Sequence, residues 1–286
     1  MSQDNEILKQ GNINDLINIM NKANDTFAYE VFVPSLGKNV PFREINTAQQ
    51  KKLVKSIIDS PVFNTEFIFT LKSIIDENCA DSSVNVGELS IYDKLLIALY
   101  MRIYSVGNDL TINLKCPDCD KVHDVNIQLS ELLDEVKDNI DITPSAIIED
   151  ETGVYKVHCQ MPTINDEYNL EDQFRRNTKI EVENQDELRE TIGNVFTSEL
   201  VKYIAKIEVK SDDKIIELDL KTMKFEDRIK LIERLNVKTL KGVVEFISNI
   251  KQEFDKITLV KMNCDCEKKT LLEKRFSIDS NFFIIS

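Results

Sequence analysis

The sequence predicts an α+β fold, in which a β-hairpin and several helices are closed into one discontinuous body by two cysteine-bearing, zinc-ribbon-like hairpins. Apolar residues alternate over residues 27–45 and then recur at helical spacing as far as residue 107. The order strand, turn with two cysteines, strand is expected at residues 110–128 and again at 257–278. The composition, 42% hydrophobic and 30% charged, is typical of an ordered globular chain.

The N-terminal part of the chain shows the clearest periodicity. Residues 13–22 predict a short amphipathic helix that either docks or forms an arm, and residues 27–45 predict a β-hairpin. Three helices are expected next, over residues 47–59, 60–79 and 90–107. The first begins with the spacing of a capping box, Thr47 with Gln50, and the third begins at Ser90.

The centre of the chain predicts a separate α+β region. The polar stretch from Thr143 to Gly153, which follows a short acidic helix, is expected to be a linker. Beyond it we expect a strand at residues 154–161 and helices at 166–176 and 186–205. A hairpin at 206–220 and two more helices, at 225–235 and 240–254, are expected next. The chain then divides into an N-terminal unit with the first cysteine hairpin, an inserted α+β region, and a second cysteine hairpin that returns to the first unit, over residues 1–135, 136–256 and 257–286.

Four of the six cysteines form two close pairs, Cys116 with Cys119 and Cys264 with Cys266. Two such pairs can complete a tetrahedral zinc shell that leaves no room for water, so the expected cofactor is one structural zinc and not a catalytic one. Two alternatives stay open: the cysteines lie at hairpin tips without a metal, or His123 substitutes for one ligand. A disulfide within Cys264-Asp-Cys266 would be strained.

The sequence offers no catalytic residues, so we expect no enzyme and no small-molecule substrate. Nucleophile-elbow, P-loop, zinc-protease and dinucleotide-binding motifs are absent from it. Cys79 and Cys159 are expected to pack in the core. His158 adjoins Cys159 in a predicted strand, where neighbouring side chains point to opposite faces, so the two do not form a nucleophile pair.

The charge and hydropathy of the chain restrict the classes of partner that we expect. A net charge of −14 makes nucleic acid an improbable partner, because phosphate binding depends on Lys and Arg. No apolar run approaches 18 residues, so we expect no membrane span. The N-terminus has no signal-peptide core, and we expect the chain to stay in a reducing compartment where it is made. A zinc-ribbon protein that binds nucleic acid is a lesser alternative.

The last residues of the chain are apolar. This tail either packs back on its own hairpin or docks on a neighbouring subunit. The second alternative makes the partner-binding residues Phe282, Phe283, Ile284 and Ile285.

Several segments together resemble a known family. They are the hairpin EVFVPSLGKNVPFREI at residues 30–45, the helix after it, the segment LSIYDKLLIALYMRIYSVG at residues 89–107, and the strand-Cys-Pro-Asp-Cys-strand. In their order they resemble the baseplate hub and hub-assembly proteins of contractile-tailed, T-even-like bacteriophages. The resemblance extends over residues 30–128 and, more loosely, 257–283.

The resemblance implies a non-enzymatic structural component of the tail baseplate hub, which acts through contacts with other phage tail proteins. It would be synthesised and assembled in the host bacterial cytoplasm and reside in the virion. The alternative is a hub assembly factor, or chaperone, that the virion does not retain. Carried over by position, the knuckle cysteines would be Cys116, Cys119, Cys264 and Cys266.

Overall fold

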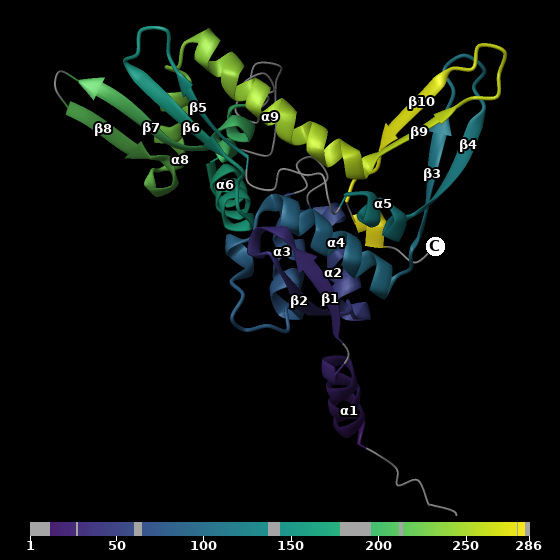
Figure 1. The fold of residues 1–286 in the computed structure, drawn as a ribbon. Coiled ribbons are helices and arrows are strands. Elements are labelled where there is room, and N and C mark those ends of the chain that lie inside the picture. The colour runs from purple at the N-terminus through teal and green to yellow at the C-terminus, as the bar shows by residue number, and fades with distance from the viewer. Residues whose placement is uncertain are drawn as a thin grey trace, which may run out of the picture.

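Helices and small antiparallel sheets alternate along the chain, which confirms the predicted α+β class (Figure 1). The computed structural model describes residues 12–26, 28–59, 65–136, 144–177, 196–211, 214–278 and 280–283. In these residues the strands form three two-stranded hairpins and one four-stranded sheet. The predicted start of the second helix at residue 60 and most of the helix predicted at 186–205 lie outside them; residues 196–203 are helical.

The first hairpin pairs β1 (Ala28–Val33) with β2 (Lys38–Arg43), as predicted. Alternate side chains of both strands are buried, because one face of the hairpin packs on helices. The connecting turn ends at Gly37, whose φ of +60° favours glycine. Helices α2 (Thr47–Asp59), α3 (Thr65–Asn78) and α4 (Ile91–Ser105) complete this part of the fold.

The first turn of α2 corrects the predicted capping box. Asn46, and not Thr47, caps the helix: its side chain accepts the Gln49 N–H at 3.0 Å, and Gln49 Oε1 accepts the Asn46 N–H at 3.1 Å. Gln50 is therefore free for another role, and its side chain donates to the carbonyl of Phe283 at 2.6 Å. Asn is a strong N-cap residue, so Asn46 caps the helix, which begins at Thr47 as predicted.

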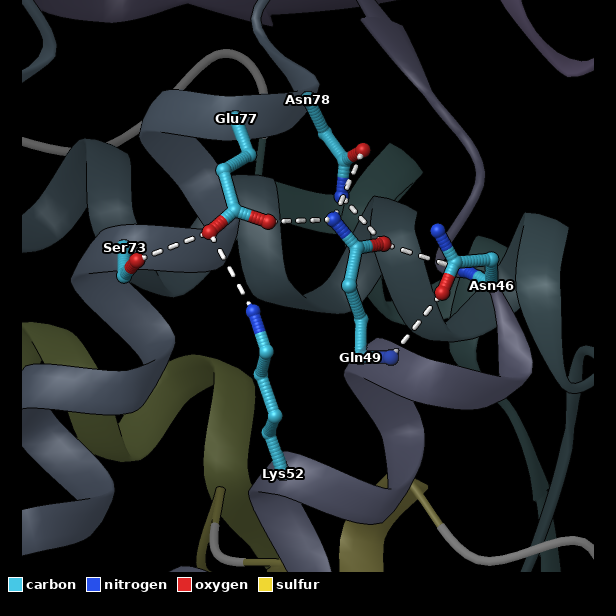
Figure 2. Close-up of polar contacts among 6 residues, drawn as sticks. All are labelled: Asn46, Gln49, Lys52, Ser73, Glu77 and Asn78. Atoms are coloured by element: carbon cyan, nitrogen blue, oxygen red, sulfur yellow. Dashed lines mark hydrogen bonds and ion pairs between the residues drawn. The ribbon is translucent and has the colours of Figure 1, made fainter. Parts of the chain in front are cut away.

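Gln49 also joins α2 to α3 (Figure 2). Its side-chain amide donates to Glu77 Oε2 at 3.0 Å and exchanges hydrogen bonds with Asn78. The second carboxylate oxygen of Glu77 accepts from Ser73 and lies 3.6 Å from Lys52 Nζ. Because Gln49 and Asn78 are buried, these bonds satisfy polar groups that would otherwise lose their contact with water.

Helix α4 begins as predicted. Ser90 and Asp93 form a complete capping box, and the carboxylate of Asp93 also accepts the N–H of Ser35 in the β1–β2 turn at 3.1 Å. Asp93 is fully buried, so its carboxylate depends on these N–H and O–H donors. After α4 the chain turns at Gly107, with φ of +143°.

The two cysteine hairpins lie side by side, although 130 residues separate them in the chain (Figure 1). The first pairs β3 (Asp109–Lys115) with β4 (Val122–Gln128), and the second pairs β9 (Leu259–Asn263) with β10 (Leu271–Arg275). Both pairings confirm the predicted hairpins. The short helix α5 (Leu129–Val136) follows the first.

The central region contains the four-stranded sheet, in the order β5-β6-β7-β8. Its strands and helices are β5 (Ser145–Glu149), β6 (Tyr155–Gln160), α6 (Ile164–Asn177), β7 (Ile204–Ser211), β8 (Lys214–Asp219), α8 (Phe225–Ile232) and α9 (Val237–Thr258). The predicted strand at 154–161, the helix at 166–176 and the hairpin at 206–220 are confirmed in type, and α9 is longer than predicted at both ends.

The predicted linker at residues 143–153 is wrong, because most of it is strand β5 and its turn. The Asp150 side chain accepts the backbone N–H groups of Thr152 and Tyr155, which turns the polar residues tightly from β5 into β6. Ile148 of β5 packs on Gly242 of α9, where an added Cβ would lie 2.9 Å from the Ile148 methyl carbon. The strand therefore depends on residues far along the chain.

The buried residues form two apolar cores. The first core combines residues of 29–133 with Ile164 and residues of 257–283. The second core combines residues of 157–250. Helix α9 contributes to both, with Ile250 in the second core and Ile257 in the first. The division into three segments, with 136–256 as an insertion, stays a prediction.

Helix α1 (Ile13–Thr26), at the N-terminal end of the described chain, confirms the predicted amphipathic helix. Figure 1 shows it projecting away from the first core, beyond β1. Every α1 side chain that the structure describes is exposed, including its large apolar ones. Among the described residues, no helix is both long and apolar enough to cross a bilayer.

Candidate metal centre

The four predicted cysteine ligands meet at the tips of the two hairpins. Cys116 and Cys119 lie in the β3–β4 turn, and Cys264 and Cys266 lie in the β9–β10 turn. Their four Sγ atoms all lie within 4.8 Å of one another, and Cys119 Sγ is 3.6 Å from Cys264 Sγ. Zn–S bonds of about 2.3 Å in a tetrahedron place sulfurs about 3.8 Å apart. The cluster therefore has the donor set and the size to hold one metal ion.

Two backbone hydrogen bonds close each turn, and their spacing differs between the turns. In the first, the Cys116 N–H donates to the Lys121 carbonyl, and the Asp120 N–H donates to the Cys116 carbonyl, each at 2.9 Å. In the second, the Cys264 N–H donates to the Thr270 carbonyl, and the Lys269 N–H donates to the Cys266 carbonyl, each at 2.9 Å. Asp120 and Lys269, with φ of 57° and 48°, make the tight return in each turn.

Burial and backbone donors give the thiols different acidities. Cys116 and Cys264 are buried, with 0% and 2% of their surface exposed, whereas Cys119 is exposed. Burial raises the pKa of Cys264 to about 12. The pKa of Cys266 is lowered to about 6, mainly because its sulfur accepts a hydrogen bond from the backbone N–H of Thr270. A metal ion binds thiolates, so its binding at this cluster would release protons.

Polar contacts join the two hairpins around the cysteines. Asp118 of the first turn accepts from Lys268 and Thr270 of the second, and Lys121 of the first donates to Asp265 of the second. These contacts are reciprocal, because each turn supplies one carboxylate and one ammonium group to the other. They lower the pKa of both carboxylates, through the bond from Lys268 to Asp118 and the bond from Lys121 to Asp265.

His123 also faces the cysteine cluster. It lies on β4 opposite Leu114, and its Nε2 atom is 3.2 Å from Cys264 Sγ and 3.9 Å from the carboxylate of Asp265. Its side chain is only 11% exposed. From the sequence, His123 was one alternative for a fourth ligand. The structure places it beside one thiol of the cluster.

The structure places the other predicted site residues elsewhere. Phe282 and Phe283 are buried in the first core, with 3% and 0% of their surface exposed. The rings of Phe282 and Phe276 are stacked, with their centroids 6.1 Å apart. This burial agrees with the alternative in which the tail packs back on its own chain, and the docking role of these two residues stays a prediction. Ile284 and Ile285 lie outside the described residues, and their docking role stays a prediction.

The remaining cysteines and histidine are not brought together. Cys79 packs beside the first core and Cys159 lies inside the second. His158 points to the opposite face of β6 from Cys159 and lies 2.9 Å from Glu208 of β7. Burial raises the pKa of Cys159 to about 12, which keeps this thiol protonated and unreactive.

The polar contacts around the cysteines were not predicted from the sequence. A signal was present: both turns contain an Asp inside the cysteine pair and Lys shortly after it, in Cys-Pro-Asp-Cys-Asp-Lys and Cys-Asp-Cys-Glu-Lys. Such repetition predicts reciprocal ion pairs once the two turns are known to face each other. The spacing of His123, four residues after Cys119, is likewise short enough to reach the site from the outgoing strand.

Comparison with known proteins agrees with the family resemblance. A family model described as T4 bacteriophage base plate protein matches residues 26–283. No curated protein and no solved structure matches the chain. The matched region contains both cores and both cysteine hairpins, and it leaves out nearly all of α1. The chain therefore belongs to the family of T4 bacteriophage base plate proteins, which assigns it a structural role in the phage tail.

Proposed function

We propose that the chain is a structural subunit of the baseplate hub region, that it acts through contacts with other tail proteins, and that it carries one structural zinc ion. The observation that carries this proposal is the family match, which spans both cores and the whole cysteine cluster. Assembly in the host cytoplasm and retention in the virion belong to the same proposal.

Helix α1 supports a role in protein–protein contacts. Ile13, Leu16, Ile17 and Met20 follow the spacing of one helical face, and each is about half exposed or more. A stripe of this kind is typical of a helix that lies in an apolar groove. Two such helices of 14 residues would bury less than the roughly 1,000 Å² that a stable interface needs, so the groove belongs to another baseplate protein and not to a second α1.

The donor set of the cluster supports zinc. Four thiolates suit Zn²⁺, whereas Mg²⁺ and Ca²⁺ prefer oxygen ligands. Four cysteines also complete the coordination shell, so the ion would have no open position for a substrate. Its role would be to tie residues 116–119 to residues 264–266 and hold the returning hairpin on the first core.

The same tie supports the predicted domain organisation. Residues 1–135 and 257–286 form one discontinuous body in this proposal, and residues 136–256 are inserted between them. Two observations support it: most buried residues of the first core come from the two ends of the chain, and, among the described residues, the buried members of the second core come from residues 157–250.

Mass spectrometry of purified virions and isolated baseplates tests the structural role. We expect the chain in both, at a fixed ratio to other baseplate proteins. Its presence in infected cells together with its absence from intact virions would contradict the proposal and favour the assembly-factor alternative.

The contribution of α1 is tested in the same particles. The double substitution Leu16→Asn with Met20→Asn removes two apolar anchors, and we expect it to reduce incorporation without changing the melting temperature of the purified chain. Asn14→Ala with Asn18→Ala, on the opposite face, is the matched control and should be incorporated normally. Full incorporation of the first variant would show that this face is not the contact.

A further inference from the structure

The structure places one histidine at one corner of the cysteine cluster. His123 Nε2 lies 3.2 Å from Cys264 Sγ, within the range of a hydrogen bond to sulfur. We propose that His123 is a positioning residue, which donates an N–H···S hydrogen bond to the Cys264 thiolate and so orients this ligand in a four-cysteine metal site. The inference rests on the proposed zinc and concerns how this chain holds the ion.

The arrangement of donors separates His123 from the four ligands. Among the described residues, two groups of metal-binding atoms lie within 4.8 Å of one another: the four cysteine sulfurs, and His123 with Cys264 and Asp265. Cys264 belongs to both groups, so His123 approaches the cluster through this one sulfur. Four thiolates already satisfy a tetrahedral ion. The imidazole is therefore placed outside the shell, against a ligand.

The surroundings of Cys264 explain why this bond matters. Its thiol is almost fully buried, so its thiolate form cannot be stabilised by water. Lys121 and Lys268, the cationic groups near the cluster, donate to the carboxylates of Asp265 and Asp118. A neutral imidazole with its proton on Nε2 supplies a donor to the sulfur without transferring that proton. Groups that support metal ligands in this way typically contribute tenfold to a hundredfold in metal affinity.

The experiment uses the full chain and compares substitutions at its two histidines. Zinc affinity is measured by competition with a chromophoric chelator, and thiolate ligands are counted from the absorption spectrum of the Co²⁺-loaded protein. His123→Leu should lower zinc affinity by about tenfold to a hundredfold while the spectrum stays that of four thiolates. His123→Gln, whose amide can replace the Nε2 donor, should recover most of the affinity.

His158→Leu is the matched control, since this second histidine lies on the central sheet beside Glu208. It should leave zinc affinity unchanged. Circular dichroism of each apo-protein shows whether the rest of the chain is folded, so a loss of affinity in a folded His123→Leu variant reports on the site.

Three outcomes would overturn the inference. Unchanged zinc affinity in His123→Leu would remove the positioning role. A wild-type Co²⁺ spectrum with three thiolates and one nitrogen, lost in His123→Leu but kept in Cys119→Ser, would make His123 a ligand. A wild-type chain that binds no zinc would overturn the proposed zinc itself, and this inference with it, whereas the first two outcomes leave the zinc proposal standing.

Discussion

The two cores of this protein are closed in different ways. The second core is built from residues of 157–250, which follow one another in the chain. The first core brings residues of 29–133 together with residues of 257–283, so it stays incomplete until the chain returns. Closing such a long loop costs conformational entropy, which the contacts at the return must offset. The cysteine cluster and Phe283 therefore lie where the fold most needs stabilising.

The largest expected effect comes from removing half of the cluster. Cys116→Ser with Cys119→Ser should prevent zinc binding and lower the free energy of unfolding by several kcal/mol, because zinc-ribbon sites fold with binding energies of roughly 10 kcal/mol or more. The effect should be confined to the first core. Melting with and without zinc measures the loss, and limited trypsin digestion should release the hairpin around Lys268 and Lys274.

Cys79→Ser is the control for that experiment, because Cys79 lies outside the cluster at the end of α3. It should leave zinc content and the digestion pattern unchanged. Unaltered melting and digestion in the double variant would mean that no metal holds the returning hairpin.

Phe283→Ala tests how much the C-terminal residues stabilise the first core. Phe283 is fully buried, so the truncation should cost about 3–5 kcal/mol. Hydrogen exchange should rise in α2 and in β9–β10 and stay low in β6–β7, which belong to the second core. Equal loss of protection in β6–β7 would show that the two cores unfold as one unit.

Lys94→Met tests the contact between the two regions. Lys94 of α4 pairs with Glu167 of α6, and both side chains are more than four-fifths buried. Without Lys94, Glu167 keeps a buried charge whose remaining support is the attraction of Lys202, so we expect a loss of about 2–4 kcal/mol at pH 7.

The pH dependence of this variant follows from the same pair. In the wild type, burial tends to raise the pKa of Glu167, but Lys94 and Lys202 outweigh it and lower the pKa. The carboxylate therefore stabilises the fold above its unfolded pKa, and this contribution is lost as pH falls through the lower folded pKa. Removing Lys94 should raise the folded pKa, so the penalty of the variant should shrink from pH 7 to pH 4. Urea unfolding at both pH values measures it, and a constant penalty would exclude a charge effect.

The smallest effect is expected at the start of α2. Asn46→Ala should cost about 1 kcal/mol, because it removes the side chain that accepts the Gln49 N–H. Thr47→Ala is the matched control on the neighbouring exposed residue and should change the free energy of unfolding by no more than a few tenths of a kcal/mol, because Ala is a better helix former than Thr. A larger loss for Thr47 in thermal unfolding would restore the capping box predicted from the sequence.

Local patterns were predicted well from the sequence. The β1–β2 hairpin, the Ser90 cap of α4 and both cysteine hairpins depend on residues close together in the chain, so their spacing carried the information. The meeting of the four cysteines was also predicted, because two half-sites of one metal have a recognisable spacing.

The features that were missed depend on distant partners. Strand β5 lies in the predicted linker because its five residues are followed by a polar turn, and neither its pairing with β6 nor its packing on Gly242 is visible in the local sequence. Phe282 and Phe283 have the apolar character of a docking surface, and only the approach of α2 shows that they are buried. His123 was named from the sequence as a substitute ligand, but its contact with Cys264, on a hairpin more than 130 residues away, is seen only in the structure.

Helix α9 gives the molecule a mechanical property. Its 22 residues extend about 33 Å, from the four-stranded sheet to the start of β9, and it is packed in the second core at Ile250 and in the first at Ile257 (Figure 1). A continuous helix anchored at both ends behaves as a rigid lever. A partner that tilts the four-stranded sheet would thus pass the rotation directly to the cysteine hairpins.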